Sequence, residues 1–189
     1  AQDDDLRMRA RIGLEVLLAD MAGEWVNGVW GASTLRTHTF VGEAADGKIS
    51  RAMGYIYFGG VAFPAPNDGC LVMSAVSSFR LPAIIEAIGT DRSTPHVHRE
   101  TAMAWHGARK TTYIDRNYAV YSQYDGNQSL FWSDQMHRAG VAWATTAPGA
   151  QFVVKHPTSN LAGESHYNQV LQHERVLVGV AKESMTGYV

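Results

Sequence analysis

The sequence predicts a mainly β fold, in which an N-terminal helix is followed by an antiparallel β-sandwich that contains one short internal helix. Two observations predict this class. The first residues carry apolar side chains at helical spacing. The chain from Thr37 onward consists of short β-branched and aromatic runs between turn signals. The length of 189 residues suits one domain, or one domain and a piece of another. We expect a helix and loop at 1–36 and the sandwich at 37–189.

The composition argues against several classes of protein. Of the residues, 46% are hydrophobic and 18% are charged, which is enough apolar surface for a folded core. A net charge of -2 argues against a nucleic-acid-binding protein. No apolar run approaches the roughly 18 residues that a membrane span needs, so we expect no membrane partner. Cys70 is the single cysteine, which excludes an intrachain disulfide.

The first element is expected to be an amphipathic helix. Asp3 to Asp5 supply negative charge where a helix N-terminus favours it. Gly23 is the expected end of the helix. Its apolar face has residues at spacings of three and four: Leu6, Ala10, Leu14, Leu17, Leu18 and Met21. The stretch EWVNGVWGAS that follows is expected to be a loop packed against a larger body.

The rest of the chain is expected to form antiparallel strands. Turn dipeptides such as Asp46-Gly47 and Asp125-Gly126 separate many of them. Strands are expected within THTFVGE, RAMGYIYFGG, CLVMSAV, RKTTYIDRNYAVYSQYD, GVAWATT, AQFVVKHP and ERVLVGVAK. The short helix is expected between Leu81 and Ile88. This spacing favours a sandwich or barrel over alternating βαβ units.

One local pattern has the composition of a metal site. In a strand, His96, His98 and Glu100 would project from the same face. Two imidazoles and a carboxylate suit zinc or non-haem iron. The alternative is a polar, solvated strand face. We expect no cofactor, and keep a structural divalent metal at these three residues as the alternative.

A second cluster lies in FWSDQMHRAGVAW. His137 can act as a general acid or base, and Arg138 can neutralise a carboxylate with two hydrogen bonds. Trp132 and Trp143 can stack on sugar rings, and Gln135 adds an amide. The alternative is a loop whose polar groups cap strand ends while the tryptophans fill the core.

Four tyrosines form a third group. Strand alternation predicts Tyr118 and Tyr124 on one face and Tyr113 and Tyr121 on the other. Most of them are expected to pack across strands. Tyr124 lies nearest the DGN turn and is the best candidate for proton transfer.

Two further features bear on a site. Arg36 and His38 follow the helix–loop junction and are placed to face a cleft between helix and sheet. The chain has no G-x-S-x-G elbow, P-loop, G-x-G-x-x-G or H-E-x-x-H motif, which disfavours a nucleotide or a serine nucleophile.

The order of the segments carries a family resemblance. A helix with Leu-Leu-Ala-Asp precedes NGVWGASTLRTHTF, YIYFGG, RKTTYIDRNYAVYSQYD and DQMHRAGVAWATTAPGAQFVVKHP. This order resembles the junction region of heparinase-type polysaccharide lyases, in which an (α/α) toroid leads into an antiparallel β-sandwich. The resemblance covers nearly the whole chain in element order and is specific from Lys110 to Pro157. It implies that Leu6 to Met21 is the last toroid helix.

The resemblance implies β-elimination at a uronic-acid-containing polysaccharide. By chemical type, His137 and Tyr124 would be catalytic. The residues that would bind substrate are Arg138, Arg36, Gln135, Trp132 and Trp143. The implied partners are an acidic polysaccharide and the remainder of the same polypeptide or a partner chain, and the implied location is secreted or periplasmic.

Two departures from the family pattern bear on this implication. Much of the family's catalytic machinery lies on upstream toroid helices, and this chain has one such helix. The zinc site of relatives pairs a His-x-His motif with a later Asp and His, and only the pairing is similar at His96 and His98.

Two other functions stay open. The first is a non-catalytic β-sandwich that binds glycans or braces a larger assembly. The second is a small metal-dependent enzyme that uses His96, His98 and Glu100. The mixture of a toroid-like helix and sandwich-like strands also leads us to expect that the 189 residues are a fragment, or one chain of a larger enzyme.

Overall fold

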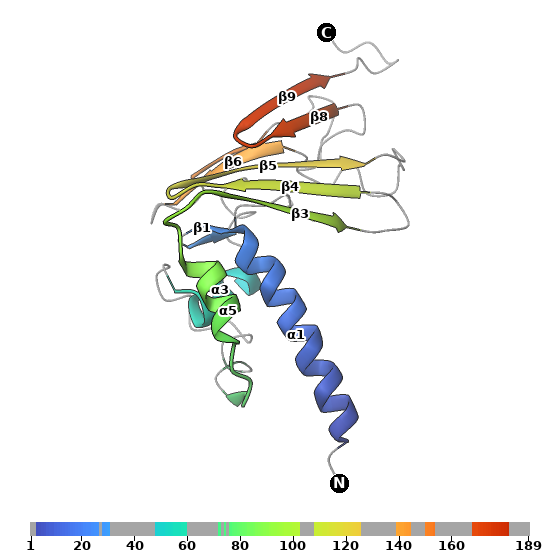
Figure 1. Ribbon diagram of the computed structural model, residues 1–189, viewed down its shortest axis with the longest axis vertical. Coiled ribbons are helices and arrows are strands. Elements are labelled where there is room, and N and C mark those ends of the chain that lie inside the picture. The colour runs from blue at the N-terminus through green and yellow to red at the C-terminus, as the bar shows by residue number, and fades with distance from the viewer. Residues whose placement is uncertain are drawn as a thin grey trace.

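A computed structural model describes residues 3–26, 28–30, 48–59, 72, 74, 76–102, 108–125, 139–144, 150–153 and 168–181. Figure 1 shows a long helix below a twisted antiparallel sheet, with a β-hairpin above the sheet. In chain order the elements are α1 (Asp4–Glu24), β1 (Trp25–Val26), β2 (Val29–Trp30), α3 (Lys48–Tyr57), α5 (Ala83–Thr90), β3 (His96–Ala102), β4 (Ala108–Ile114), β5 (Tyr118–Asp125), β6 (Ala139–Trp143), β7 (Gln151–Val153), β8 (Asn168–His173) and β9 (Val176–Ala181).

The N-terminal helix and the antiparallel sheets agree with the prediction, but helix and strand occupy comparable shares of the described residues. Two segments expected as strands are helical: most of RAMGYIYFGG belongs to α3, and residues 72, 74 and 76 of CLVMSAV are also helical. The physical reason for α3 is its apolar spacing. Ile49, Met53 and Ile56 recur at intervals of four and three, and this helical period prevails over the aromatic composition. THTFVGE lies outside the described residues.

Helix α1 begins and ends close to the expected positions. The Asp3 side chain accepts hydrogen bonds from the backbone N–H groups of Asp5 and Leu6, each at 3.1 Å, and so caps the helix. Only the last two turns contribute buried side chains, beginning with Leu18. The N-terminal half projects from the body (Figure 1). Its exposed apolar side chains are Leu6, Met8, Ile12, Val16 and Leu17.

The main core lies where α1, α3 and α5 meet. Its buried members are Leu18, Met21, Ala22, Trp25, Phe58 and Ile85. The rings of Trp25 and Phe58 lie 5.8 Å apart between centroids. Gly54 of α3 lies against the Trp25 ring so closely that a Cβ there would overlap it. Each fully buried large side chain stabilises the fold by about 1.5–3 kcal/mol, so this core fixes the end of α1.

The stretch expected as a loop after α1 is a short hairpin. Trp25 pairs with Trp30 and Val26 with Val29, around Gly28. Gly28 has a φ of 108°, which glycine adopts without strain. Val26 packs against Ile114 of the large sheet, so this hairpin joins the helical core to the strands.

The large sheet has the strand order β3-β4-β5-β6-β7, with antiparallel pairing throughout. A turn at residues 115–117 separates β4 from β5, so the alternation expected for the tyrosines breaks there. Tyr113 pairs with Val120 and therefore shares a face with Tyr118, whose ring lies 6.2 Å away. The expected grouping of Tyr113 with Tyr121 was wrong for this reason.

The hairpin of β8 and β9 packs against β5, with the large sheet between it and α1 (Figure 1). The Gln172 side-chain amide donates to the Val120 carbonyl at 2.8 Å. Val170 is buried, whereas Leu171 and Val178 are exposed on the other side of the hairpin. Strand β9 was expected, but β8 was not, because NQVLQH is mostly polar. None of the described helices is long and apolar enough to cross a membrane.

Candidate functional site at the helix–sheet junction

Most of the residues expected to act on substrate lie outside the described residues. Tyr124 is described only through its backbone, in β5. Trp143 ends β6, pairs directly with Tyr118 across the strands and is 43% exposed. The expected site residues outside the described part are Arg36, Trp132, Gln135, His137 and Arg138, together with His38.

The pattern on β3 is placed as the alternation predicts. His96, His98 and Glu100 are alternate residues of one strand, and both imidazoles lie against the last turns of α1. The His96 Nε2 atom lies 3.2 Å from the Gly23 carbonyl oxygen, and His98 Nε2 lies 2.9 Å from Asp20 Oδ1. The two histidines therefore have different partners, and His96 faces the helix backbone.

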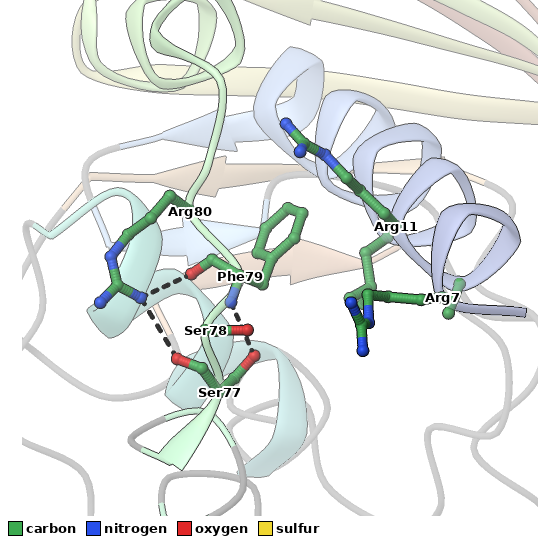
Figure 2. A pocket seen from close by; sticks show the side chains of 8 residues that line it. Arg7, Arg11, Ser77, Ser78, Phe79 and Arg80 are labelled. Carbon is green, nitrogen blue, oxygen red and sulfur yellow. Dashed lines mark hydrogen bonds between the residues drawn. The ribbon is translucent and has the colours of Figure 1, made fainter. Parts of the chain in front are cut away.

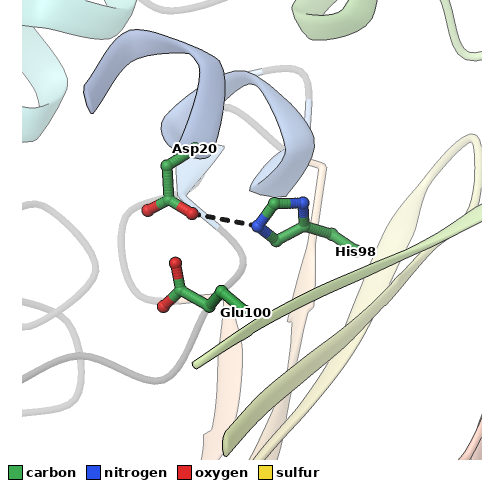
Figure 3. Close-up of side chains that lie close together, drawn as sticks. All are labelled: Asp20, His98 and Glu100. Atoms are coloured by element: carbon green, nitrogen blue, oxygen red, sulfur yellow. Dashed lines mark hydrogen bonds and ion pairs between the residues drawn. The ribbon is translucent and has the colours of Figure 1, made fainter. Parts of the chain in front are cut away.

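A carboxylate from α1 completes a group of three. Ligand atoms of Asp20, His98 and Glu100 lie within 4.8 Å of one another. Figure 3 shows the Asp20 carboxylate, from the helix, facing the His98 ring and the Glu100 carboxylate, which come from the neighbouring strand. Their side chains are 23–30% exposed, so the group is half-buried and accessible to solvent. The set differs from the expected one, because Asp20 takes the place of His96.

A buried lysine lies beside this group. Lys110 is the direct cross-strand partner of Glu100, and its Nζ forms ion pairs with Glu100 and with Glu24, the latter at 3.2 Å. The Thr112 hydroxyl donates to Glu24 at 3.0 Å. Glu24 is fully buried, and the Lys110 side chain is 10% exposed. We call Asp20, Glu24, His98, Glu100 and Lys110 the junction cluster.

The environment separates the pKa values of the two acids in the group of three. Burial and a hydrogen bond with Asp20 raise the pKa of Glu100 to about 7. The nearby positive charge of Lys110 acts to lower this pKa but does not prevail. Burial also acts to raise the pKa of Asp20, but hydrogen bonds with His98 and Glu100 and the charge of Lys110 lower it to about 2. Asp20 is therefore ionised near neutral pH, whereas Glu100 gains or loses its proton in that range.

The two cations respond to the same carboxylates. The hydrogen bond to Asp20 raises the pKa of His98 despite its burial, which favours the imidazolium. Burial acts to lower the pKa of Lys110, but the charges of Glu24 and Glu100 raise it, so Lys110 stays protonated.

Arg92 connects the residue after α1 to the end of α5. Its guanidinium is buried and donates to the backbone carbonyls of Trp25, of Gly89 at 2.9 Å and of Ile88 at 2.7 Å. These bonds join the end of α1 to the C-terminal turn of α5. Carbonyls that a helix end leaves unpaired are satisfied in this way. The position of Asp20 relative to β3 is thus fixed by packing and by hydrogen bonds.

Sequence reasoning did not identify Asp20, which lies 78 residues from His98. One signal was present in the sequence. Asp20 and Glu24 are acids in the C-terminal turns of a helix, where the dipole disfavours negative charge. Acids at such positions call for compensating partners elsewhere in the fold, and His98, Lys110 and Thr112 provide them.

Two carboxylates and an imidazole can perform two kinds of chemistry. The donor set suits zinc, manganese or iron(II), which take oxygen and imidazole ligands together. The separated pKa values also suit the exchange of a proton near neutral pH.

No protein-family model, curated protein or solved structure matches this chain. The resemblance to heparinase-type lyases therefore stays a prediction from the sequence.

Proposed function

We propose that the chain binds one divalent metal ion through Asp20, His98 and Glu100. The observation that carries this proposal is the convergence of three ligand atoms, from a helix and a strand, within 4.8 Å. In a tetrahedral site with ligands about 2.1 Å from the ion, neighbouring donors lie roughly 3.4 Å apart. The side chains need only small movements to reach that geometry.

The protonation of the site predicts how a metal ion would bind. A cation would displace the proton of Glu100 and the imidazolium proton of His98, because metal ligands bind in their deprotonated forms. Lys110 keeps Glu24 as a partner when Glu100 turns toward the ion, so its charge stays compensated. When bound, such an ion supplies a Lewis acid that polarises a substrate oxygen or activates water. Three protein ligands are the number typical of catalytic zinc sites.

Isothermal titration of zinc into the purified chain at pH 7.5 tests this proposal. We expect one equivalent to bind, with release of protons that is seen by repeating the titration in buffers of different ionisation enthalpy. Asp20→Asn and His98→Ala should abolish binding, and circular dichroism should show that both variants are folded. His96→Ala is the matched control and should bind zinc normally, because His96 faces the Gly23 carbonyl. Zinc binding that is absent in the wild type, or unchanged in Asp20→Asn and His98→Ala, would contradict the proposal.

As a second function, the chain acts in a polysaccharide lyase that cleaves a uronic-acid-containing glycan by β-elimination. The support is the resemblance from Lys110 to Pro157 and the aromatic pair of Tyr118 with the exposed Trp143, which suits stacking on a sugar. In this proposal His137 and Tyr124 transfer protons. Arg138, Arg36, Gln135, Trp132 and Trp143 bind the polysaccharide. Neutralising the uronate carboxylate makes the neighbouring carbon a stronger acid, which is what elimination requires.

An absorbance assay for unsaturated uronate products, with a panel of uronate polymers and the full native protein, tests the elimination. A flat trace on every polymer would refute it. If Trp143→Ala weakens retention on a polysaccharide column while no polymer is cleaved, the alternative function holds, in which a β-sandwich binds glycans without catalysis.

We also propose a fold, partners and a location for the chain. The hairpin of β8 and β9 against the large sheet supports a β-sandwich among the strands from β3 onward. The boundary at residue 37 stays a prediction, because the described elements between it and β3 are the helices α3 and α5. The exposed apolar side chains of α1 support packing against further helices, from the same polypeptide or from a partner chain. A secreted or periplasmic location is tested by cell fractionation, in which recovery from the cytoplasm alone would refute it.

A further inference from the structure

A second concave site lies between the N-terminal half of α1 and the segment 77–80. It is a cavity of about 390 Å³. Figure 2 shows Arg7 and Arg11 on the helix at one side and Ser77, Ser78, Phe79 and Arg80 at the other. The lining residues are Arg7, Ala10, Arg11, Leu14, Ser77, Ser78, Phe79 and Arg80, none of which belongs to the junction cluster. We call this site the arginine cavity.

The charge of the arginine cavity favours an anion. Among its described lining residues three are arginines and none is acidic. Arg7 and Arg11 lie one turn apart on α1, and Arg80 comes from the opposite wall. A guanidinium binds a carboxylate or sulfate with two parallel hydrogen bonds.

Each of these arginines already has a partner. Arg7 pairs with Asp4 at 3.3 Å and Arg11 with Glu15 at 2.8 Å, and the side chains of both arginines are at least 60% exposed. Exposed pairs of this kind contribute about 0–1 kcal/mol each, so an anion that enters the cavity can replace them at little cost. Arg80 donates through Nη1 to the backbone carbonyls of Ser77, at 3.2 Å, and of Phe79, at 2.8 Å, and must turn from them to bind the same anion (Figure 2).

The remaining lining supplies hydroxyls and an apolar wall. Ser77 and Ser78 each carry a hydroxyl that can donate to a ligand. The Phe79 ring is held edge-on against Tyr57, with 5.9 Å between ring centroids, and forms a fixed apolar surface together with Leu14. A volume of about 390 Å³ is at the small end of ligand sites.

We propose that the arginine cavity binds one acidic sugar unit. Such a unit combines an anionic group, several hydroxyls and an apolar ring face. These three features match the arginines, the serines and the wall of Phe79 and Leu14 respectively. The choice of a sugar among organic anions rests on the proposed function, whereas the affinity for an anion rests on the lining alone.

Titration calorimetry with trigalacturonate at low salt tests the proposal. The matched neutral probe is the methyl ester of the same trisaccharide, and inorganic sulfate is the third probe. Loss of a bidentate, charge-assisted contact weakens binding by tenfold or more, so Arg11→Ala and Arg80→Ala should each raise the Kd at least tenfold. Arg9→Ala is the matched control. Arg9 lies on the same helix, pairs with Asp5 and does not line the cavity, so its Kd should change less than twofold.

Four results would overturn the proposal: no binding of trigalacturonate, equal binding of its methyl ester, an equal loss in Arg9→Ala, or inorganic sulfate binding as tightly as trigalacturonate. The last result would leave an oxyanion site with no preference for a sugar. The Asp20→Asn variant separates this proposal from the metal site, because it should bind trigalacturonate as the wild type does. A flat elimination assay would refute the lyase function without altering these affinities.

Discussion

Replacing Lys110 with alanine removes the cation that lies between two carboxylates at the helix–sheet junction. Glu24 is 0% exposed and would lose its ion pair while it keeps the hydrogen bond from the Thr112 hydroxyl, and Glu100 can take up a proton. Removing one partner of a buried ion pair costs about 3–5 kcal/mol. Because the Thr112 hydrogen bond remains, we expect the lower end, about 3 kcal/mol. A domain with about 5–15 kcal/mol of stability stays folded after this loss.

Urea denaturation followed by tryptophan fluorescence measures the effect. With a slope of about 1–3 kcal/mol per molar urea, a loss of about 3 kcal/mol lowers the midpoint by about 1–3 M. Arg109→Ala is the control, because Arg109 is the neighbouring, exposed residue of the same strand, and it should change stability by less than about 0.5 kcal/mol. The double variant Glu24→Gln/Lys110→Met should recover much of the loss, since it leaves no buried charge unpaired. A loss below about 1 kcal/mol in Lys110→Ala would show that the junction cluster is not packed as described.

Three further predictions concern stability. Burial raises the pKa of Glu100 from 4.5 to about 7, so the unfolded chain loses this proton first and the free energy of unfolding falls as pH rises between these values. Over this range the fall is about 3 kcal/mol. Glu100→Gln should flatten the slope in urea titrations at pH 5 and 7.5, and an unchanged slope would refute the assignment. Gly54→Ala forces a Cβ into the Trp25 ring and should lower the free energy of unfolding by about 1–3 kcal/mol. Gly13→Ala is the control: open space surrounds Gly13, so this variant should raise the free energy of unfolding by up to about 1 kcal/mol. Equal melting temperatures of the two variants would contradict this packing. Arg92→Lys keeps the positive charge but loses the planar guanidinium that donates to several backbone carbonyls. This variant should lower the free energy of unfolding by about 1–3 kcal/mol in the same thermal melts. An unchanged melting temperature would show that these carbonyls are bonded to water instead.

The parts of the fold that the sequence predicted are those with a strong local signal. Apolar spacing identified α1, the short helix expected between Leu81 and Ile88 is α5, and β-branched runs between turns identified strands such as β4, β6 and β9. Helix α3 was missed because its tyrosines and isoleucines have the composition of a strand, although their spacing is helical. The short hairpin at Trp25–Trp30 was missed because two-residue strands give no periodic signal.

The candidate site divides in the same way. His98 and Glu100 were predicted to share a face, because strand alternation is a local property, and this was confirmed. Asp20 could not be joined to them from the sequence, because the contact depends on how α1 packs across the sheet. The described ligand atoms that cluster are those of Asp20, His98 and Glu100, while His96 Nε2 lies 3.2 Å from the Gly23 carbonyl oxygen, so the set with His96 stays a prediction. The roles proposed for His137 and Tyr124 stay predictions.

Anomalous diffraction from a crystal soaked in zinc shows whether Asp20, His98 and Glu100 form a metal site. We expect a single strong peak in the anomalous difference map, within about 2.0–2.3 Å of a carboxylate oxygen of Asp20, a carboxylate oxygen of Glu100 and Nε2 of His98. A map with no peak between these three side chains, in crystals where zinc has bound elsewhere, would contradict it.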